Sequence, residues 1–420
     1  MKLLYVTSRL PVPPLVKGDT LRDFHIIREL ASRGHKITLV SYYRKDENTS
    51  PSLPLLTKYL SDIKLIPFSI RKQARNLYGG LYTLKPFQVL LYNSPVFSTS
   101  IRHEIETGTY DLAYTHFARM GDFLLGYDIP KILDLQDSLR QNTMDRYYKY
   151  KKQGNILMQY VSLFDSFKMN LYEKQTLHQF NACLVVSDRD IPEGHPNIHV
   201  IPNGIEAGRP LPFKRKEKDG IIFFGDMAYF SNNDAAIFLI KKIMPLVWQK
   251  KPKLKIYIAG HAPGKALKKL VSDRVIVTGF VPNLEVYFRK AHIAVSPLRL
   301  GTGMQNKVLE AMRSGLPQIV TEKGAGGFRN LTGKEFITTS EDKHAIANAI
   351  IELLQDETKQ QKLITESLAY LKTNYSWEKS IDEMEILLFK AIQPVDNTSL
   401  QKDSVKEFIE STETSLKAEI

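Results

Sequence analysis

The sequence predicts an α/β protein made of two Rossmann-like, doubly wound domains. Short apolar runs alternate with helix-patterned segments along most of the chain, which is the pattern of parallel strands joined by crossover helices. A polar, basic, proline-containing stretch from Ala207 to Gly220 divides this alternation into two series. The length of 420 residues is also too great for one ordinary core, so we expect two domains of roughly 200 residues each.

The first series starts at the N-terminus with a strand, a helix and a strand. These are Leu3–Thr7, Asp19–Arg33 and Ile37–Ser41, and such a βαβ unit favours a parallel sheet. Gly34 ends the helix. Further strands are expected at Lys64–Pro67, Leu112–Thr115, Lys131–Leu135, Ala182–Val186 and His199–Ile201, and helices at Pro95–Thr107 and, long and basic, from about Asn142 to Phe180.

The second series follows the turn signal Pro202-Asn203-Gly204. Strands are expected at Ile221–Phe224, Lys255–Ala259, Val275–Thr278, Ile293–Ser296, Gln318–Thr321 and Glu335–Thr338, and helices at Asn232–Gln249 behind Ser231, Lys265–Val271, Leu284–Lys290 and Asn306–Arg313. Three further helices are expected, at Lys343–Leu354, Thr358–Thr373 and Ser376–Ala391. The alternative for the last two is one continuous, kinked helix. We therefore expect domains at residues 1–205 and 206–375, a closing helix at 376–392 that packs back on the first domain, and a polar tail at 393–420.

The strongest functional signal lies at residues 299–315, which read Arg-Leu-Gly-Thr-Gly-Met-Gln-Asn-Lys-Val-Leu-Glu-Ala-Met-Arg-Ser-Gly. After a buried strand they predict a glycine loop and then a helix. A helix N-terminus presents free backbone N–H groups and a positive dipole, and anions bind there. Arg299 and Lys307 add charge, and Glu310 lies about one turn beyond Lys307. The pattern suits a nucleotide sugar, and the alternative is a structural loop with a solvated charge pair.

The composition of the chain indicates which classes of partner and which cellular compartment suit this protein. The net charge of +13 suits phosphorylated ligands or an anionic membrane surface, whereas the sequence shows no motif typical of nucleic-acid binding. The single cysteine, Cys183, excludes an intrachain disulfide and fits a cytoplasmic protein. The N-terminus reads as a strand rather than a signal peptide, and no apolar run approaches the roughly 18–20 residues of a membrane span.

One stretch suggests peripheral attachment at the inner face of the membrane. No acidic residue occurs between Asp62 and Glu104, whereas basic and aromatic residues are mixed there. This composition suits a surface that meets an anionic membrane or a lipid-linked acceptor. The alternative is a solvated basic face whose aromatic rings belong to the core. The residues are Lys64, Arg71, Lys72, Arg75, Lys85 and Arg102, with Tyr78, Tyr82, Phe87, Tyr92 and Phe97.

These features together resemble the GT-B glycosyltransferases, in which two Rossmann-like domains face a central cleft, and among them the retaining family GT4. The resemblance covers nearly all of the chain before the tail and is most specific from Ile293 to Pro317. The opening Gly18-Asp19 with Arg22 is similar to sugar transferases of bacterial exopolysaccharide and protein-sorting gene clusters. Other stretches that carry the resemblance are Gly279-Phe280-Val281, Ala291–Pro297, Leu309–Met312 and Tyr375-Ser376-Trp377.

The resemblance implies a role for each matching residue. Glu310 would hold the ribose hydroxyls, Arg299 and Lys307 would face the diphosphate, and the backbone of Val281 would meet the nucleobase. His116 would line the acceptor side. The implied donor site comprises Gly18, Asp19, Arg22, Gly225, Asp226, Val281, Arg299, Gly301, Thr302, Gly303, Lys307 and Glu310, with His116 and Glu310 as catalytic residues.

Two positions depart from the family pattern. Thr302 stands where the first glutamate of a Glu-x7-Glu motif is expected, and Gly225-Asp226 stands where an Arg and Lys pair is usual. The implied function is a retaining hexosyltransferase that moves a sugar from a nucleotide-diphosphate sugar to a glycan, lipid-linked or other cell-envelope acceptor, without a metal or other cofactor. Asp134 and Asp137 are the nearest carboxylate pair, and their spacing is weak for a metal. Because Thr302 replaces the first glutamate of the motif, the alternative remains that the chain is a catalytically idle GT-B protein that binds a nucleotide or an assembly partner.

Overall fold

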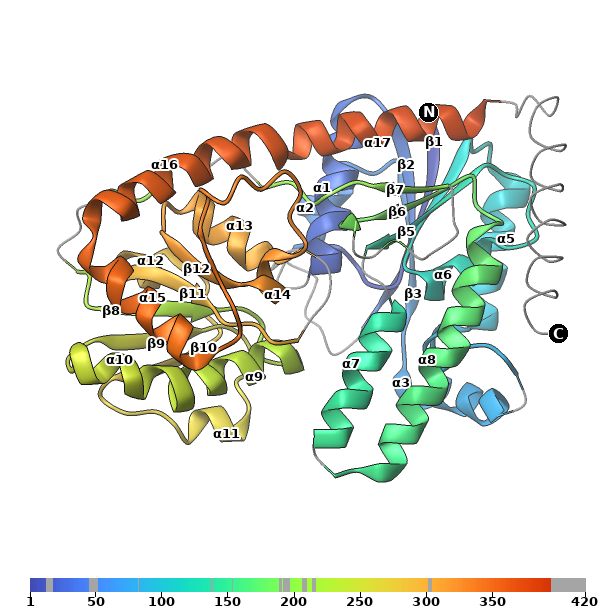
Figure 1. The fold of residues 1–420 in the computed structure, drawn as a ribbon. Coiled ribbons are helices and arrows are strands. Elements are labelled where there is room, and N and C mark those ends of the chain that lie inside the picture. The colour runs from blue at the N-terminus through green and yellow to red at the C-terminus, as the bar shows by residue number, and fades with distance from the viewer. Residues whose placement is uncertain are drawn as a thin grey trace, which may run out of the picture.

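The computed structural model describes residues 1–12, 18–44, 52–81, 83–136, 139–152, 154–188, 191, 197–205, 210–213, 217–300 and 304–393. Within these ranges two parallel sheets form two separate α/β halves (Figure 1). The strand orders are β3-β2-β1-β4-β5-β6-β7 and β10-β9-β8-β11-β12-β13. The order reverses once in each sheet, between β1 and β4 and between β8 and β11, as in doubly wound folds. The predicted class of two Rossmann-like domains is confirmed.

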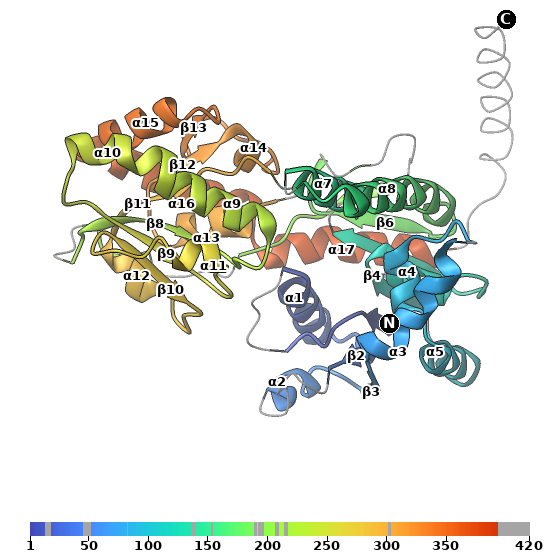
Figure 2. The same ribbon diagram turned by 90° about the horizontal axis from the view of Figure 1, so that it is seen from below.

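The first sheet is built from continuous apolar runs because helices cover both of its faces (Figure 2). Its strands are β1 Lys2–Thr7, β2 Lys36–Tyr43, β3 Asp62–Pro67, β4 Leu112–His116, β5 Lys131–Gln136, β6 Ala182–Val185 and β7 Ile198–Val200. The helices of this half are α1 Gly18–Ser32, α2 Leu53–Thr57, α3 Ile70–Gln73, η1 Ala74–Leu81, α4 Phe87–Tyr92, α5 Pro95–Thr107, α6 Ala118–Gly121, η2 Asp122–Leu124, α7 Leu139–Lys152 and α8 Ile156–Leu177.

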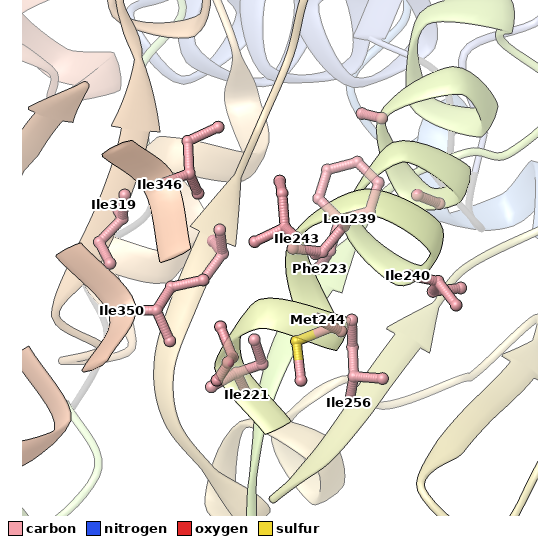
Figure 3. Packing of buried hydrophobic residues seen from close by; sticks show 14 of the residues in the cluster. Ile221, Phe223, Leu239, Ile240, Ile243, Met244, Ile256, Ile319, Ile346 and Ile350 are labelled. Atoms are coloured by element: carbon pink, nitrogen blue, oxygen red, sulfur yellow. The ribbon is translucent and has the colours of Figure 1, made fainter. Parts of the chain in front are cut away.

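The second sheet has the same construction with shorter strands. These are β8 Gly220–Phe224, β9 Lys255–Ala259, β10 Val275–Gly279, β11 Ala291–Ser296, β12 Gln318–Thr321 and β13 Ile337–Thr339. The helices are α9 Phe230–Phe238, η4 Leu239–Ile243, α10 Met244–Lys250, α11 Lys265–Lys268, α12 Glu285–Lys290, α13 Asn306–Arg313, α14 Glu322–Ala325, α15 Lys343–Gln355, α16 Glu357–Asn374 and α17 Trp377–Ile392. Figure 3 shows the core of this half, where apolar side chains from the strands, from α9–α10 and from α15 point toward one another.

The last helix, α17, returns to the first half. It runs on from α16 along one side of the molecule in Figure 1, and Ile381, Met384 and Leu388 pack into the core beneath β1. Glu385 fixes this contact, because its carboxylate accepts from Arg33 Nη1 at 2.8 Å. The two closing helices are separate, since the Ser376 side chain accepts from the backbone N–H of Lys379 and caps α17.

One predicted helix is broken in two, and another is present but contains an irregular turn. The helix expected from about Asn142 to Phe180 is an α7–α8 hairpin, because Gly154 takes a left-handed backbone (φ 68°) and Asn155 caps α8. The helix expected at Asn232–Gln249 starts at Phe230 and contains the π-helical segment η4 just before α10. Pro245, in the first turn of α10, has no backbone N–H to donate, which favours this irregularity.

Candidate functional site

Polar side chains gather at the carboxyl edges of both sheets, where doubly wound folds bind ligands. In the second half the centre of this group is Lys307, in the first turn of α13. Its Nζ donates to Asn232 Oδ1 at 2.7 Å and to Gln305 Oε1 at 2.9 Å. Burial lowers the pKa of Lys307 to about 7. No carboxylate of the described ranges forms an ion pair with Lys307, so this cation is held by neutral oxygens alone.

Two glycines allow this close packing. Gly225 follows β8 with φ 150°, and a Cβ there would lie 3.0 Å from Asn232 Nδ2 and 3.2 Å from Lys307 Cε. Gly260 follows β9 with φ 146°, and a Cβ there would lie 1.8 Å from the Gly225 carbonyl oxygen. The loops after β8 and β9 are therefore stacked directly on each other beside Lys307.

Asp226 makes hydrogen bonds within the loop that follows β8. Its Oδ1 accepts from the backbone N–H of Ala228 at 3.0 Å and lies 3.3 Å from His261 Nδ1. Its carbonyl oxygen accepts from Asn232 Nδ2 at 2.8 Å. Asn232 thus joins the loop after β8 to Lys307, a role that the sequence analysis did not assign to it.

The other donor residues predicted in this half lie apart from the contacts of Lys307. Arg299 pairs with Asp234 Oδ2 at 2.7 Å and lies over the Phe238 ring, so α9 holds it. Glu310 is partly exposed and pairs with Arg313 in the same helix. Val281 is half-buried in the loop after β10. Gly301, Thr302 and Gly303 lie outside the described residues.

The first half presents a buried network around His116, the last residue of β4. The His116 Nδ1 lies 2.7 Å from Asp23 Oδ1, and the Nε2 lies 3.1 Å from Gln136 Oε1. Burial by itself lowers the pKa of His116, but the Asp23 carboxylate outweighs burial and raises it. Both ring nitrogens face oxygen acceptors, which the imidazolium satisfies with two N–H donors. His116 is therefore arranged to donate hydrogen bonds rather than to remove a proton.

Backbone strain surrounds His116. Phe117 has φ 66° and Gln136 has φ 60°, and neither is glycine. Such conformations are costly for L-residues and concentrate at ligand-binding sites. The strain makes the ends of β4 and β5 a candidate ligand-binding edge of the first sheet.

Arg22 belongs to a buried ion pair. It is fully buried, its Nε donates to Asp134 Oδ2 at 2.6 Å, and its Nη1 donates to Asn203 Oδ1 at 2.9 Å. Asn203 in turn donates to Asn306 Oδ1 at 3.3 Å, next to Lys307. Asn203 is expected from the sequence only as part of a turn, whereas in the structure it bridges the two halves.

The remaining predicted residues of the first half lie at the start of α1. Gly18 is the first residue of this helix, and Asp19 is buried and pairs with Arg9. In the described part of the chain no three His, Cys, Asp or Glu side chains gather in a way that could hold a metal ion. No helix in those same ranges is long and apolar enough to cross a membrane.

Comparisons with known proteins show what this chain is similar to. Residues 218–356, which include Gly225, Lys307 and Glu310, match the family model described as "Glycosyl transferases group 1". The structure is similar to sucrose-phosphate synthase from Thermosynechococcus elongatus, with a TM-score of 0.68, 16% identity and coverage of 93% of this chain and 99% of that chain. It is also similar to HepE from Anabaena in complex with UDP-glucose, with a TM-score of 0.65, 13% identity and coverage of 93% and 100%.

One curated relative is described as an uncharacterized 44.6 kDa protein in the cps region of Klebsiella pneumoniae. It is 21% identical over 398 residues, which cover 90% of this chain and 97% of the relative. The structural matches confirm the predicted GT-B fold and the resemblance to GT-B glycosyltransferases.

Proposed function

We propose that this chain, which has the GT-B fold and matches the group 1 glycosyl transferases over residues 218–356, transfers a sugar from a nucleotide-diphosphate sugar to an acceptor. The observation that carries the proposal is Lys307. It is a half-buried lysine held by neutral oxygens, in the first turn of a helix, at the carboxyl edge of the second sheet. This is the setting in which a protein stabilises a bound diphosphate.

On the donor side, Lys307 and the free N–H groups of α13 neutralise the charge that develops on the departing diphosphate. Glu310, about one turn further along α13, accepts hydrogen bonds from the ribose hydroxyls. The backbone of Val281 contacts the nucleobase. HepE, a protein of the same fold, is described in complex with UDP-glucose, which supports a nucleotide-sugar donor here.

The reaction breaks the bond between the sugar C1 and the diphosphate oxygen and forms a bond between C1 and an acceptor hydroxyl oxygen. The hydroxyl proton leaves with the diphosphate. We propose that the configuration at C1 is retained, as in family GT4, and that fixed cations replace a metal ion. His116 is buried and both of its ring nitrogens face Asp23 and Gln136, so we propose that it positions the edge of the first sheet that meets the acceptor and does not bind the sugar itself. The cps-region relative supports a role in polysaccharide biosynthesis, for which we propose a glycan or lipid-linked acceptor.

A two-step experiment tests the proposal. Thermal-shift screening with a panel of nucleotide sugars and nucleoside diphosphates identifies the donor, because a ligand that binds the folded state raises its melting temperature. A transfer assay with that donor then compares the wild type with Lys307→Met and with the exposed control Lys253→Met. We expect turnover in the wild type and the control, and a loss of about 100-fold or more in Lys307→Met. Nucleotide binding without turnover on any acceptor would favour a catalytically idle protein.

We also propose that the first half attaches to an anionic membrane surface. The acid-free stretch between Asp62 and Glu104 suggests this attachment, and the surface of α8 in the structure supports it as well. Six large apolar side chains are exposed along one stripe of α8, with Leu157 73% and Tyr160 65% exposed. The two carboxylates of α8, Asp165 and Glu173, are buried. The α7–α8 hairpin projects from the body of the molecule in Figure 1. The stripe consists of Ile156, Leu157, Tyr160, Leu163, Phe164 and Phe167.

This stripe borders the stretch between Asp62 and Glu104 that lacks acidic residues. Lys168 of α8 donates from Nζ to the Thr83 carbonyl oxygen at 2.7 Å, next to Leu84, which is 61% exposed. In the same stretch Arg71 and Arg75 are exposed, whereas Phe97 lies in the core. Apolar side chains beside exposed arginines complement an anionic bilayer.

Vesicle co-sedimentation tests this attachment. We expect binding to vesicles that contain phosphatidylglycerol and weak binding to pure phosphatidylcholine vesicles. Leu157→Ser/Tyr160→Ser should lose binding, and Val271→Ser/Val286→Ser, two exposed apolar residues of the second half, should keep it. Equal binding to both kinds of vesicle, or binding to neither, would contradict the attachment.

A further inference from the structure

A small cavity lies at the carboxyl ends of β1, β2 and β3, beside the His116 network but not part of it. It has a volume of about 50 Å³ and is lined by Arg9 and Arg44 together with the rings of Tyr42, Phe68 and Tyr92. One buried water occupies about 10–15 Å³ of such a cavity. The cavity therefore has room for a single carboxylate or phosphate group and is too small for a sugar ring.

Arg119 lies behind this cavity and adds a buried positive charge. It is 7% exposed, and its Nη2 donates to Ser8 Oγ, which lines the cavity, at 3.0 Å. Its guanidinium lies over the rings of Phe117 and Tyr92, 4.0 and 4.8 Å from the ring centres. Its Nε has no hydrogen-bond partner in the structure.

Arg119 has no acid of its own among the described residues. Among the described residues, no carboxylate forms an ion pair with Arg119, and the nearby Asp19 pairs with Arg9 instead. A buried cation without a paired anion destabilises a fold, and such groups concentrate at binding sites. Because Ser8 Oγ accepts from Arg119, its own proton can be donated to a group in the cavity. Cations and a hydroxyl donor around a small cavity suit an oxyanion.

We propose that this cavity binds an oxyanion of the acceptor, either a phosphate, as on a lipid carrier, or the carboxylate of an acidic sugar. The inference rests on the proposed function, because it assigns the acceptor to the edge of the first sheet. The position supports it, since Tyr229 from the loop after β8 lies close enough to Arg9 and Arg119 to influence the pKa of both. An anion bound here lies between the first sheet and the donor half. The strained backbone of Phe117 sets the ring on which Arg119 is stacked.

Calorimetric titration tests the site with three probes: phenyl phosphate, methyl glucuronide and neutral methyl glucoside. Each is added to the full chain in the presence of a saturating nucleoside diphosphate, so that the donor site is filled. The variants are Arg119→Gln, Arg44→Gln and the control Arg102→Gln, which removes an exposed arginine of α5. Arg44 is exposed, so Arg44→Gln should fold normally. It therefore tests the site even if Arg119→Gln does not fold.

We expect at least one anionic probe to bind the wild type and Arg102→Gln equally, with a Kd raised about tenfold in Arg119→Gln and several-fold in Arg44→Gln. Phenyl phosphate alone would identify a phosphate group, and methyl glucuronide alone an acidic sugar. Equal affinity in all variants, or binding of methyl glucoside as tight as that of the anions, would overturn the site. If nucleoside diphosphates bind but both anions bind all variants equally, only this inference fails. If no nucleoside diphosphate binds, the proposed function fails.

Discussion

Lys307 Nζ donates to Asn232 Oδ1 at 2.7 Å, and this contact ties the start of α13 to the start of α9. The two residues come from segments that follow β11 and β8, the strands between which the strand order of the second sheet reverses. The pair holds a half-buried lysine at the point where a doubly wound sheet binds its ligand. Because its partners are neutral, the positive charge of protonated Lys307 can be neutralised by a bound anion.

Binding of a nucleoside diphosphate should be accompanied by proton uptake. With a pKa of about 7, Lys307 is about one-tenth protonated at pH 8 in the free protein. A diphosphate at Lys307 raises this pKa, so binding should take up nearly one proton. Calorimetry in two buffers of different ionisation enthalpy measures the uptake. Lys307→Met should show none and Lys253→Met the wild-type value, whereas equal uptake in all three proteins would place the diphosphate elsewhere.

The Asp23–His116 pair should make stability depend on pH. The pKa of His116 is raised above its ordinary value of 6.5 in the folded protein. Its contribution is therefore fully present below pH 6.5 and is lost as pH rises through the folded-state pKa. Asp23→Asn should lower the free energy of unfolding by about 1.5–3 kcal/mol at pH 6 and by less at pH 9. Urea titrations at the two pH values measure this, and a constant difference would rule out a protonated His116.

The Arg22–Asp134 pair should contribute mainly to stability. Both side chains are fully buried, so Arg22→Met leaves a buried carboxylate without its cation and should cost about 3–5 kcal/mol. Adding Asp134→Asn removes that charge, and the double-mutant cycle should give a coupling of about 1–3 kcal/mol. Denaturant unfolding of the four proteins measures it. Loss of nucleotide binding in a fully stable Arg22→Met protein would instead assign Arg22 to the donor site.

Gly260 and Gly279 offer a matched comparison. Both have positive φ, but a Cβ at Gly260 would lie 1.8 Å from the Gly225 carbonyl oxygen, whereas a Cβ at Gly279 meets nothing within 4 Å. Gly279→Ala should therefore cost only about 1–2 kcal/mol of backbone strain. Gly260→Ala should cost about 3 kcal/mol or more and displace Lys307. Thermal unfolding with and without nucleotide compares the two. Similar losses would show that the loops after β8 and β9 are not rigidly stacked.

The alternation of strands and helices could be predicted because buried parallel strands are continuous apolar runs that short-range patterns reveal. The break at Gly154 was missed because a single glycine among polar residues is a weak signal, and Asn155 acts only through its cap geometry. The site was harder to predict, since its partners are distant in sequence. Arg22 and Asp134 are 112 residues apart, and Asn203 and Asn306 are 103 apart.

The charges at the site also depend on three-dimensional packing. Lys307 and Arg299 look alike in the sequence as basic residues that flank a glycine loop. In the structure Asp234 pairs with Arg299, while the side chain of Lys307 is held by neutral oxygens. The local sequence does not distinguish these two settings, because the partners that differ, Asn232 and Asp234, both lie in α9.

The most direct test of the central claim is transfer of a labelled sugar from the donor found by screening, with the product analysed by NMR. A sugar-transferring GT-B enzyme should give a glycoside whose anomeric configuration equals that of the donor, and Lys307→Met should lower kcat by about 100-fold or more while Lys253→Met does not. An inverted product would contradict retention. Wild-type turnover in Lys307→Met, or no turnover by a wild type that binds the donor, would contradict the role given to Lys307 and the transferase itself.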